Sequence, residues 1–217
     1  MISSDLDPLL AVDSNTLSFY EANAISYANQ TAKVDLTHLY SSFLSRLPLG
    51  ARILDVGCGS GRDLKAFHEK GYEAIGVDPS PSLVKIAREW SGCKVEVGRA
   101  ETLRFKAMFD GAWACASLLH LPRRYFPLAL SKINKCLKRD GILFLSMQEG
   151  SGEGACDDGR YFSYYRRQEL SFELSNAGFE IIQIWTTADS LFKRNAISWI
   201  NIVARKIESS INLPVHL

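Results

Sequence analysis

Short apolar runs alternate with longer amphipathic stretches along most of the chain. Five runs have the length and composition of buried strands, and glycine, proline or aspartate separates them from stretches with helical periodicity. The predicted strands span residues 51–56, 73–77, 94–97, 109–116 and 142–147. The helices predicted after the first, second and fourth strands span 62–70, 79–90 and 122–138. This alternation is typical of a parallel sheet with helices on both faces.

The pattern changes after the fifth predicted strand. Residues 150–159 are polar and rich in glycine, which predicts a loop, and residues 166–177 form a helical pattern closed by Gly178. Two strand-like runs, 180–187 and 197–204, then follow with no helix between them. Because such strands pair most simply as a hairpin, we expect an antiparallel pair at this end. The prediction is an α/β fold with a seven-stranded, mostly parallel sheet.

Two further helices, 15–28 and 36–47, are predicted before the first strand. No linker, internal repeat or low-complexity segment divides the chain. We therefore expect a single domain over residues 1–217, in which residues 1–49 form a helical N-terminal segment before a core at 50–206.

The composition is that of an ordinary globular protein. Hydrophobic residues make up 47% of the 217 residues and charged residues 23%, and the net charge of +1 does not indicate a strongly basic face for nucleic acid. The N-terminus lacks the features of a secretory signal, and no apolar run approaches the roughly 20 residues of a membrane-spanning helix. We therefore expect a cytoplasmic protein that works without a membrane.

The cysteines and histidines predict neither a disulfide framework nor a metal site. The five cysteines are odd in number and contain no CxxC pair, which fits a reduced protein. The four histidines have no HExxH spacing or other zinc pattern. Cys58 and Cys115 have no basic sequence neighbour that would activate a thiolate, so we expect buried, unreactive thiols there.

A glycine-rich loop follows the first predicted strand. It reads DVGCGSG (residues 55–61), and its alternating glycines allow a ligand to lie against the backbone at the start of the next helix. Such a loop alone serves many ligands. The dinucleotide fingerprint has glycine or alanine at its sixth position, where this chain has Arg62, and this argues against an NAD enzyme.

Asp78 ends the second predicted strand, 17 residues after Gly61. An acidic side chain at this place can accept hydrogen bonds from both hydroxyl groups of a ribose. The alternative is a helix N-cap, because Asp78-Pro79-Ser80 precedes a helix. We expect the carboxylate to be exposed and to contribute little to the core. The glycine loop at the right distance before it favours ribose binding.

Five segments, taken in order, resemble the class I S-adenosylmethionine-dependent methyltransferases. They are LDVGCGSG, GVDPSPSLVKIAR, GRAETL, FDGAWACASLLHLP and LKRDGILFLS, and the resemblance covers residues 15 to about 206. The joint order is specific to the family, although each segment alone is not. The antiparallel pair near the end of the chain also matches the sheet of this family. The resemblance implies a Rossmann-like fold, methyltransferase activity and S-adenosylmethionine as the cofactor.

The resemblance also implies roles for individual residues. The loop at 55–59 would line the methionine end of the cofactor, and Asp78 would hold its ribose. Ala100 and Glu101 would face the adenine, and residues 116–117 would lie beneath the methionine part. The full set of expected cofactor-binding residues is Tyr20, Tyr27, Asp55, Gly57, Cys58, Gly59, Arg62, Asp78, Pro79, Ser80, Ala100, Glu101, Ala116 and Ser117.

Tyr20 and Tyr27 are seven residues apart and so lie on one face of the first predicted helix. In many members of the family such a helix covers the cofactor, which would make residues 1–49 a helical lid. The alternative is that both rings pack against the core.

His120 is the candidate general base. Methyl transfer from an activated sulfonium mainly requires alignment and exclusion of water, and a base only where the acceptor must lose a proton early. His120 follows the fourth predicted strand, beside the expected reaction point, and its unperturbed pKa lies near neutrality. The alternative is a structural histidine bonded to a backbone carbonyl.

The polar loop after the fifth predicted strand should border the methyl acceptor, because ligands of open α/β sheets bind outside the carboxyl ends of the strands. Arg160 could form a two-pronged contact with an anionic acceptor, or it could cap a solvated hinge. The expected acceptor-binding residues are His120, Glu153, Arg160, Tyr161 and Tyr164.

Three functions remain open from the sequence. The first is methylation of a small molecule, anionic or hydroxylated. The second is methylation of tRNA, because GRYFSYYRRQEL and NAISWINIVARK somewhat resemble the C-terminal part of wobble-uridine tRNA methyltransferases, although the near-neutral charge argues against it. The third is cofactor binding without catalysis. The basic residues that would contact RNA phosphates are Arg123, Arg124, Arg166, Arg167, Lys193 and Arg194.

Overall fold

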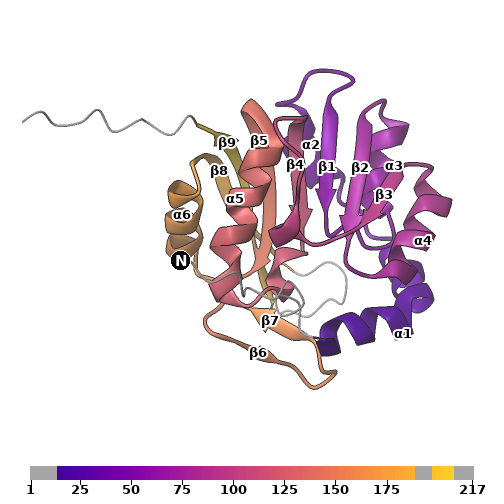
Figure 1. Ribbon diagram of the computed structural model, residues 1–217. Helices are drawn as coiled ribbons and strands as arrows, with labels where there is room; N and C mark the ends of the chain where they lie inside the picture. The colour runs from indigo at the N-terminus through magenta and orange to yellow at the C-terminus, as the bar shows by residue number, and fades with distance from the viewer. Residues whose placement is uncertain (1–13, 189–196, 208–217) are drawn as a thin grey trace, which may run out of the picture.

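The computed structural model describes residues 14–188 and 197–207, and its main feature is a seven-stranded sheet in the order β3-β2-β1-β4-β5-β9-β8 (Figure 1). β1 to β5 pair in parallel, whereas β9 runs antiparallel to both β5 and β8. The predicted fold class is therefore confirmed. The strands of this sheet are β1 (Arg52–Val56), β2 (Glu73–Asp78), β3 (Lys94–Val97), β4 (Phe109–Cys115), β5 (Leu137–Gln148), β8 (Phe179–Ala188) and β9 (Ser198–Lys206).

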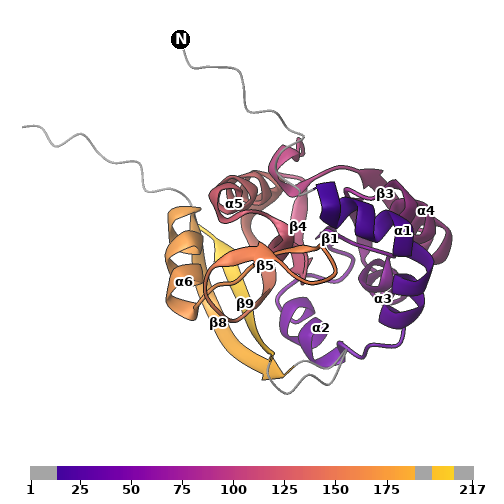
Figure 2. The same ribbon diagram turned by 90° about the horizontal axis from the view of Figure 1, so that it is seen from below.

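Helices cover both faces of the sheet (Figure 2). Each face has its own buried apolar cluster. In the cluster on one face, Trp113 of β4 stacks on Phe144 of β5 with 3.9 Å between the ring centroids. Because both faces are buried, the central strands are continuous apolar runs rather than alternating ones. The helices on that face are α2 (Thr37–Leu44), α3 (Arg62–Glu69) and α4 (Pro81–Ser91), and those on the other are α5 (Phe126–Cys136) and α6 (Arg167–Asn176).

The helix predicted at 122–138 begins and ends elsewhere. Residues Arg123–Tyr125 form a 3-10 turn, η4, and α5 then begins at Phe126. Pro127, not Pro122, lies in the first turn of α5, where a missing N–H leaves no helical bond unmade.

The sequence predicted that the Asp140-Gly141 pair ends a helix. The pair lies inside β5 instead. Asp140 has a left-handed φ of +58°, and the register between β4 and β5 shifts between Phe109 and Gly111. Between the pairs Phe109–Leu137 and Gly111–Ile142, β5 has three more residues than β4, so a signal typical of a turn marks an irregularity inside the strand here.

The loop predicted at 150–159 contains a strand that the sequence did not indicate. β6 (Glu153–Ala155) pairs antiparallel with β7 (Tyr161–Ser163) as a small separate hairpin. Strands of three residues are too short to show an alternating pattern, which is why no pattern in the sequence indicated them.

α1 (Ser14–Thr31) crosses the end of the sheet where the parallel strands have their carboxyl ends, and the β6–β7 hairpin lies at the same end (Figure 1). Residues 1–13 of the expected N-terminal segment lie outside the described residues. No helix within 14–188 and 197–207 combines the length and the apolar character needed to cross a membrane.

Candidate active site

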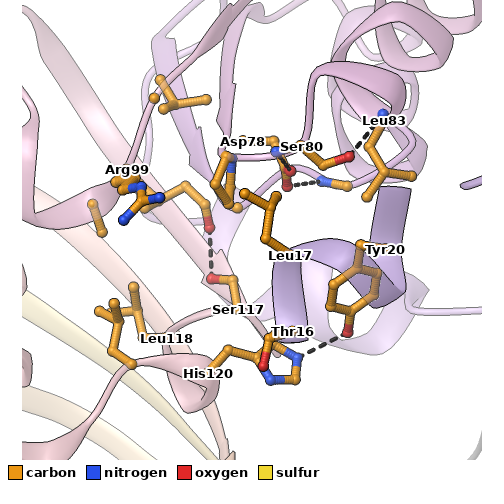
Figure 3. Close-up of a pocket in the computed structure, with 18 of the residues that line it drawn as sticks. Thr16, Leu17, Tyr20, Asp78, Ser80, Leu83, Arg99, Ser117, Leu118 and His120 are labelled. Carbon is orange, nitrogen blue, oxygen red and sulfur yellow. Dashed lines mark hydrogen bonds between the residues drawn. The ribbon is translucent and has the colours of Figure 1, made fainter. Parts of the chain in front are cut away.

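A pocket, called here the first pocket, lies at the carboxyl ends of β1, β2 and β4 and beside α1 (Figure 3). The strand order changes direction between β1 and β4, which is where open α/β sheets bind ligands. The sequence missed its apolar walls, such as Leu17 and Leu118, because such side chains look like core residues in a sequence. The expected residues that line it are Tyr20, Tyr27, Gly57, Gly59, Asp78, Pro79, Ser80, Ala100, Glu101, Ala116, Ser117 and His120.

The glycine loop presents bare backbone to the first pocket. Gly57 has a φ of +74°, and a Cβ at this position would lie 2.3 Å from the Cβ of Ser117. Gly59 has a φ of +54°, and a Cβ there would lie 3.4 Å from the ring of Tyr27. Larger residues are therefore excluded at Gly57 by both conformation and space, and a ligand can approach the main chain.

Asp78 is buried rather than exposed, and it organises the loop. Its Oδ2 accepts a hydrogen bond from the amide of Gly59 at 2.8 Å, and its Oδ1 accepts one from the amide of Ser80 at 2.9 Å. The N-cap of α4 is Ser80, whose hydroxyl accepts from the amide of Leu83, so Asp78 is not the helix cap. Burial raises the pKa of Asp78 to about 6 against the effect of its two amide bonds.

Glu101 lies in a 3-10 turn, η2 (Ala100–Thr102), at the edge of the first pocket. Both carboxyl oxygens are buried, and neither has a hydrogen-bond partner among the described residues. Burial raises the pKa of Glu101. A buried carboxyl group without a partner is costly, so this position is suited to a ligand that donates hydrogen bonds.

Three expected cofactor residues do not line the first pocket. Asp55 is buried beneath the loop with one oxygen lacking a partner, and burial, with Asp63 nearby, raises its pKa well above the usual range. The thiol of Cys58 is buried against Gly76. Arg62 holds Asp63 through two hydrogen bonds, at 2.6 Å and 3.0 Å, and faces a different cavity.

Asp63 is in turn the centre of a buried network that the sequence did not reveal. It accepts hydrogen bonds from the hydroxyl of Tyr40 at 2.6 Å and from the indole N–H of Trp113 at 2.8 Å. Arg62 and these two donors satisfy the carboxylate, which explains how the charge is tolerated inside the protein.

His120 ends η3 (Leu118–His120) and connects it to α1 and β7. Figure 3 shows its contact with Tyr20 of α1. Its Nδ1 lies 2.8 Å from the carbonyl oxygen of Tyr161, which can only accept, so Nδ1 carries the proton. Its Nε2 then accepts the hydroxyl proton of Tyr20 at 2.8 Å. Burial lowers the pKa of His120 to about 4, so the ring is neutral at pH 7. This geometry favours a histidine that orients its neighbours, and the role of general base stays a prediction.

A second cavity, of about 650 Å³, lies beside the first pocket between α1 and the β6–β7 hairpin. It contains the expected acceptor residues Arg160 and Tyr164, together with His120. The cavity also includes Phe19, Phe162 and Trp199, which come from three distant parts of the chain. Sequence analysis missed these aromatic residues because only the fold brings them together.

The expected acceptor residues Glu153 and Tyr161 line neither cavity. The carboxylate of Glu153 accepts hydrogen bonds from the amide of Arg123 at 2.6 Å and the hydroxyl of Ser163 at 3.2 Å. The amide of Tyr161 donates to the hydroxyl of Thr16 at 2.7 Å, which ties the hairpin to α1. Both residues therefore support the walls of the second cavity.

Comparison with known proteins decides the family. Residues 27–184 match the family described as a methyltransferase domain. The chain belongs to that family. Membership confirms the inference from the sequence that the chain is a class I S-adenosylmethionine-dependent methyltransferase, whose cofactor is S-adenosylmethionine.

A curated relative is the ubiquinone biosynthesis O-methyltransferase of Xanthomonas axonopodis pv. citri, 38% identical over 109 residues. The match covers 46% of this chain and 44% of the relative, so the chain spans less than half of the relative's length.

Solved structures share the fold at lower identity. The Burkholderia thailandensis 1,6-didemethyltoxoflavin-N1-methyltransferase, with its substrate and S-adenosylhomocysteine bound, has a TM-score of 0.73 at 24% identity, covering 90% of this chain and 87% of that one. The cyclase SpnF has a TM-score of 0.74 at 19% identity, covering 92% and 98%. The fold alone therefore does not specify methyl transfer.

Proposed function

We propose that this chain transfers the methyl group of S-adenosylmethionine to a small molecule bound in the second cavity. The observation that carries this proposal is that the two cavities share a boundary. Tyr20, Tyr27, Ala116 and His120 line both of them. A cofactor in the first pocket and an acceptor in the second cavity would meet at these four residues, which is the arrangement that direct transfer requires.

The residues of the first pocket fit this cofactor. The Asp78 carboxylate keeps lone pairs for ribose hydroxyl groups, because each oxygen uses only one on a backbone amide. The unpartnered carboxyl group of Glu101 suits the amino group of adenine. The bare backbone at Gly57 and Gly59 leaves room for the methionine part. We propose these residues as the ones that hold the cofactor.

S-adenosylmethionine, when bound, supplies a methyl group on a positively charged sulfur that is already activated. The protein then has to align the acceptor and exclude water. α1 covers both cavities, and its Tyr20 is held in place by His120. We propose that His120 orients the Tyr20 hydroxyl at the boundary, because its own Nε2 lone pair is occupied and its pKa of about 4 makes it a weak base.

A small molecule is favoured over RNA as the acceptor. The curated relative is an O-methyltransferase of ubiquinone biosynthesis, and the Burkholderia neighbour is bound to a small substrate. Of the basic residues proposed for RNA, Arg123 is held by Glu169 at 2.5 Å and lies over the ring of Tyr165. Lys193 and Arg194 lie outside the described residues. RNA methylation and cofactor binding without catalysis remain as alternative outcomes of the test.

The test uses S-adenosylmethionine tritiated in its methyl group. The purified chain is incubated separately with fractionated small-molecule extract and with bulk tRNA. We expect label in a small-molecule fraction. Label in tRNA alone would favour the RNA alternative, and no label despite tight cofactor binding would favour the non-catalytic one. A Gly57→Ala variant controls for contaminating enzymes, since its affinity for the cofactor should be more than about tenfold lower.

A further inference from the structure

The walls of the second cavity are strongly aromatic. The rings of Phe162 and Tyr164 are parallel within 14°, with 6.2 Å between their centroids. Such walls favour a flat ligand, because planar rings stack on aromatic faces with little loss of conformational freedom. The aromatic residues are Phe19, Tyr20, Tyr27, Phe162, Tyr164 and Trp199.

Both arginines of this cavity are already paired with carboxylates. Its described lining contains two arginines, Arg62 and Arg160, and two acidic residues, Asp157 and Asp158. Arg62 is bonded to Asp63 through two nitrogen atoms. The cavity therefore offers an incoming anion no guanidinium group without a carboxylate partner.

Arg160 is held especially firmly. Its Nη2 lies 2.6 Å from Oδ2 of Asp158, and its Nε lies 3.0 Å from the same oxygen. Its guanidinium carbon lies 4.6 Å from the ring centroid of Phe19 and 5.2 Å from that of Phe162. Hydrogen bonds from Arg160 hold the pKa of Asp158 well below its usual range. The thiol of Cys156 donates a further bond to Asp158, so the carboxylate is fixed on two sides.

This pairing changes what the cavity can bind. An anionic acceptor would have to displace the Asp158 carboxylate from Arg160 or remain beside two negative charges. Displacement only exchanges one ion pair for another, so the anion gains little, and it leaves the Asp158 carboxylate as a negative charge beside the bound anion. A flat, uncharged ring neither displaces the carboxylate nor is repelled by it.

We propose that Asp158 sets the charge selectivity of the acceptor site, so that the site takes a flat, uncharged aromatic molecule and rejects its carboxylate analogue. By neutralising Arg160, Asp158 turns a potential anion site into a stacking surface. This inference rests on the proposed function of the second cavity, and it replaces the anionic acceptor that Arg160 suggested in the sequence.

The experiment measures binding of two matched probes to the protein saturated with S-adenosylhomocysteine. The probes are 6-hydroxy-2-naphthamide and 6-hydroxy-2-naphthoate, which have the same shape and differ in charge, and naphthol fluorescence reports their binding. We expect the wild type to bind the amide at least about tenfold more tightly. The Asp158→Asn variant removes the negative charge that neutralises Arg160 and should gain at least about tenfold in affinity for the naphthoate.

Asp157→Asn is the matched control, because it removes the same charge from the same cavity without breaking the bond to Arg160. It should leave the ratio of the two affinities within about twofold. Arg160→Met, which keeps the apolar contact but removes the cation, should discriminate against the naphthoate at least as strongly as the wild type. This variant keeps the test valid if Asp158→Asn does not fold.

Several results would overturn the inference. One is that the wild type binds the naphthoate as tightly as the amide. Another is that Asp157→Asn changes the ratio of the two affinities as much as Asp158→Asn does. A third is that neither probe binds. The proposed function fails separately, if the protein does not bind S-adenosylhomocysteine at the outset.

Discussion

Replacing Asp78 with asparagine keeps the size of the side chain and removes its charge from the first pocket. Asparagine has a single carbonyl oxygen, so only one of the Gly59 and Ser80 amides keeps its acceptor. The unpaired amide costs about 1–3 kcal/mol of stability. Removal of the buried charge has the opposite effect on stability. The raised pKa of about 6 means that this charge destabilises the ligand-free protein by about 3 kcal/mol above pH 7, and asparagine removes that cost.

The two effects on stability nearly cancel, whereas the effect on affinity does not. Hydrogen bonds from ribose hydroxyl groups to a carboxylate contribute about 1.5–3 kcal/mol. Asp78→Asn should therefore weaken S-adenosylhomocysteine binding by about 10- to 150-fold, with a free energy of unfolding that changes by less than about 2 kcal/mol. Calorimetric titration measures the affinity, and urea denaturation of the ligand-free protein measures the stability.

Asp110→Asn is the matched control. Asp110 accepts from the amide of Arg52 at 2.9 Å and from the Lys138 amine at 2.8 Å, and it lines neither cavity. This variant should lose about 1 kcal/mol of stability and leave the affinity unchanged. If Asp78→Asn instead lost stability and kept its affinity, Asp78 would hold the loop without contacting the cofactor, contrary to this prediction.

Three further predictions follow from the same geometry. Gly57→Ala should weaken S-adenosylhomocysteine binding more than about tenfold in a titration. Gly92 also has a positive φ, +70°, but has open space around it, so Gly92→Ala should cost only about 1 kcal/mol of stability and leave the affinity unchanged. Affinity should fall as the pH drops through about 6, by at most about tenfold per pH unit, because the raised pKa of Asp78 means that its carboxylate is protonated there; a pH-independent affinity would contradict this. The His120 imidazole should titrate near pH 4 in NMR spectra, assigned with His120→Gln, and a midpoint near 6.5 would show that the ring is solvated rather than bonded to Tyr20 and Tyr161.

The first pocket was largely predictable because its signals are local. The glycines must adopt positive φ angles, Asp78 must end a strand at a fixed distance after them, and both requirements appear in short stretches of sequence. Burial was less predictable. Asp78 was expected to be exposed, yet α1 and the loop enclose it, and the sequence does not specify how α1 is placed across the sheet.

The second cavity was only partly predictable, because distant segments build it. Phe19 comes from α1, Phe162 from the β6–β7 hairpin and Trp199 from β9. Arg160 was recognised as a candidate contact. Its partner Asp158 is only two residues away but was overlooked, because pairing across a tight turn depends on the backbone conformation and not on the spacing alone.

Binding of S-adenosylmethionine in the first pocket underlies every function proposed here for this chain. Calorimetric titration of the purified chain with S-adenosylhomocysteine, and in parallel with NAD, tests this most directly. We expect one S-adenosylhomocysteine site per chain, weakened more than about tenfold in Gly57→Ala, and no measurable heat of binding with NAD. Binding of NAD without binding of S-adenosylhomocysteine would contradict it.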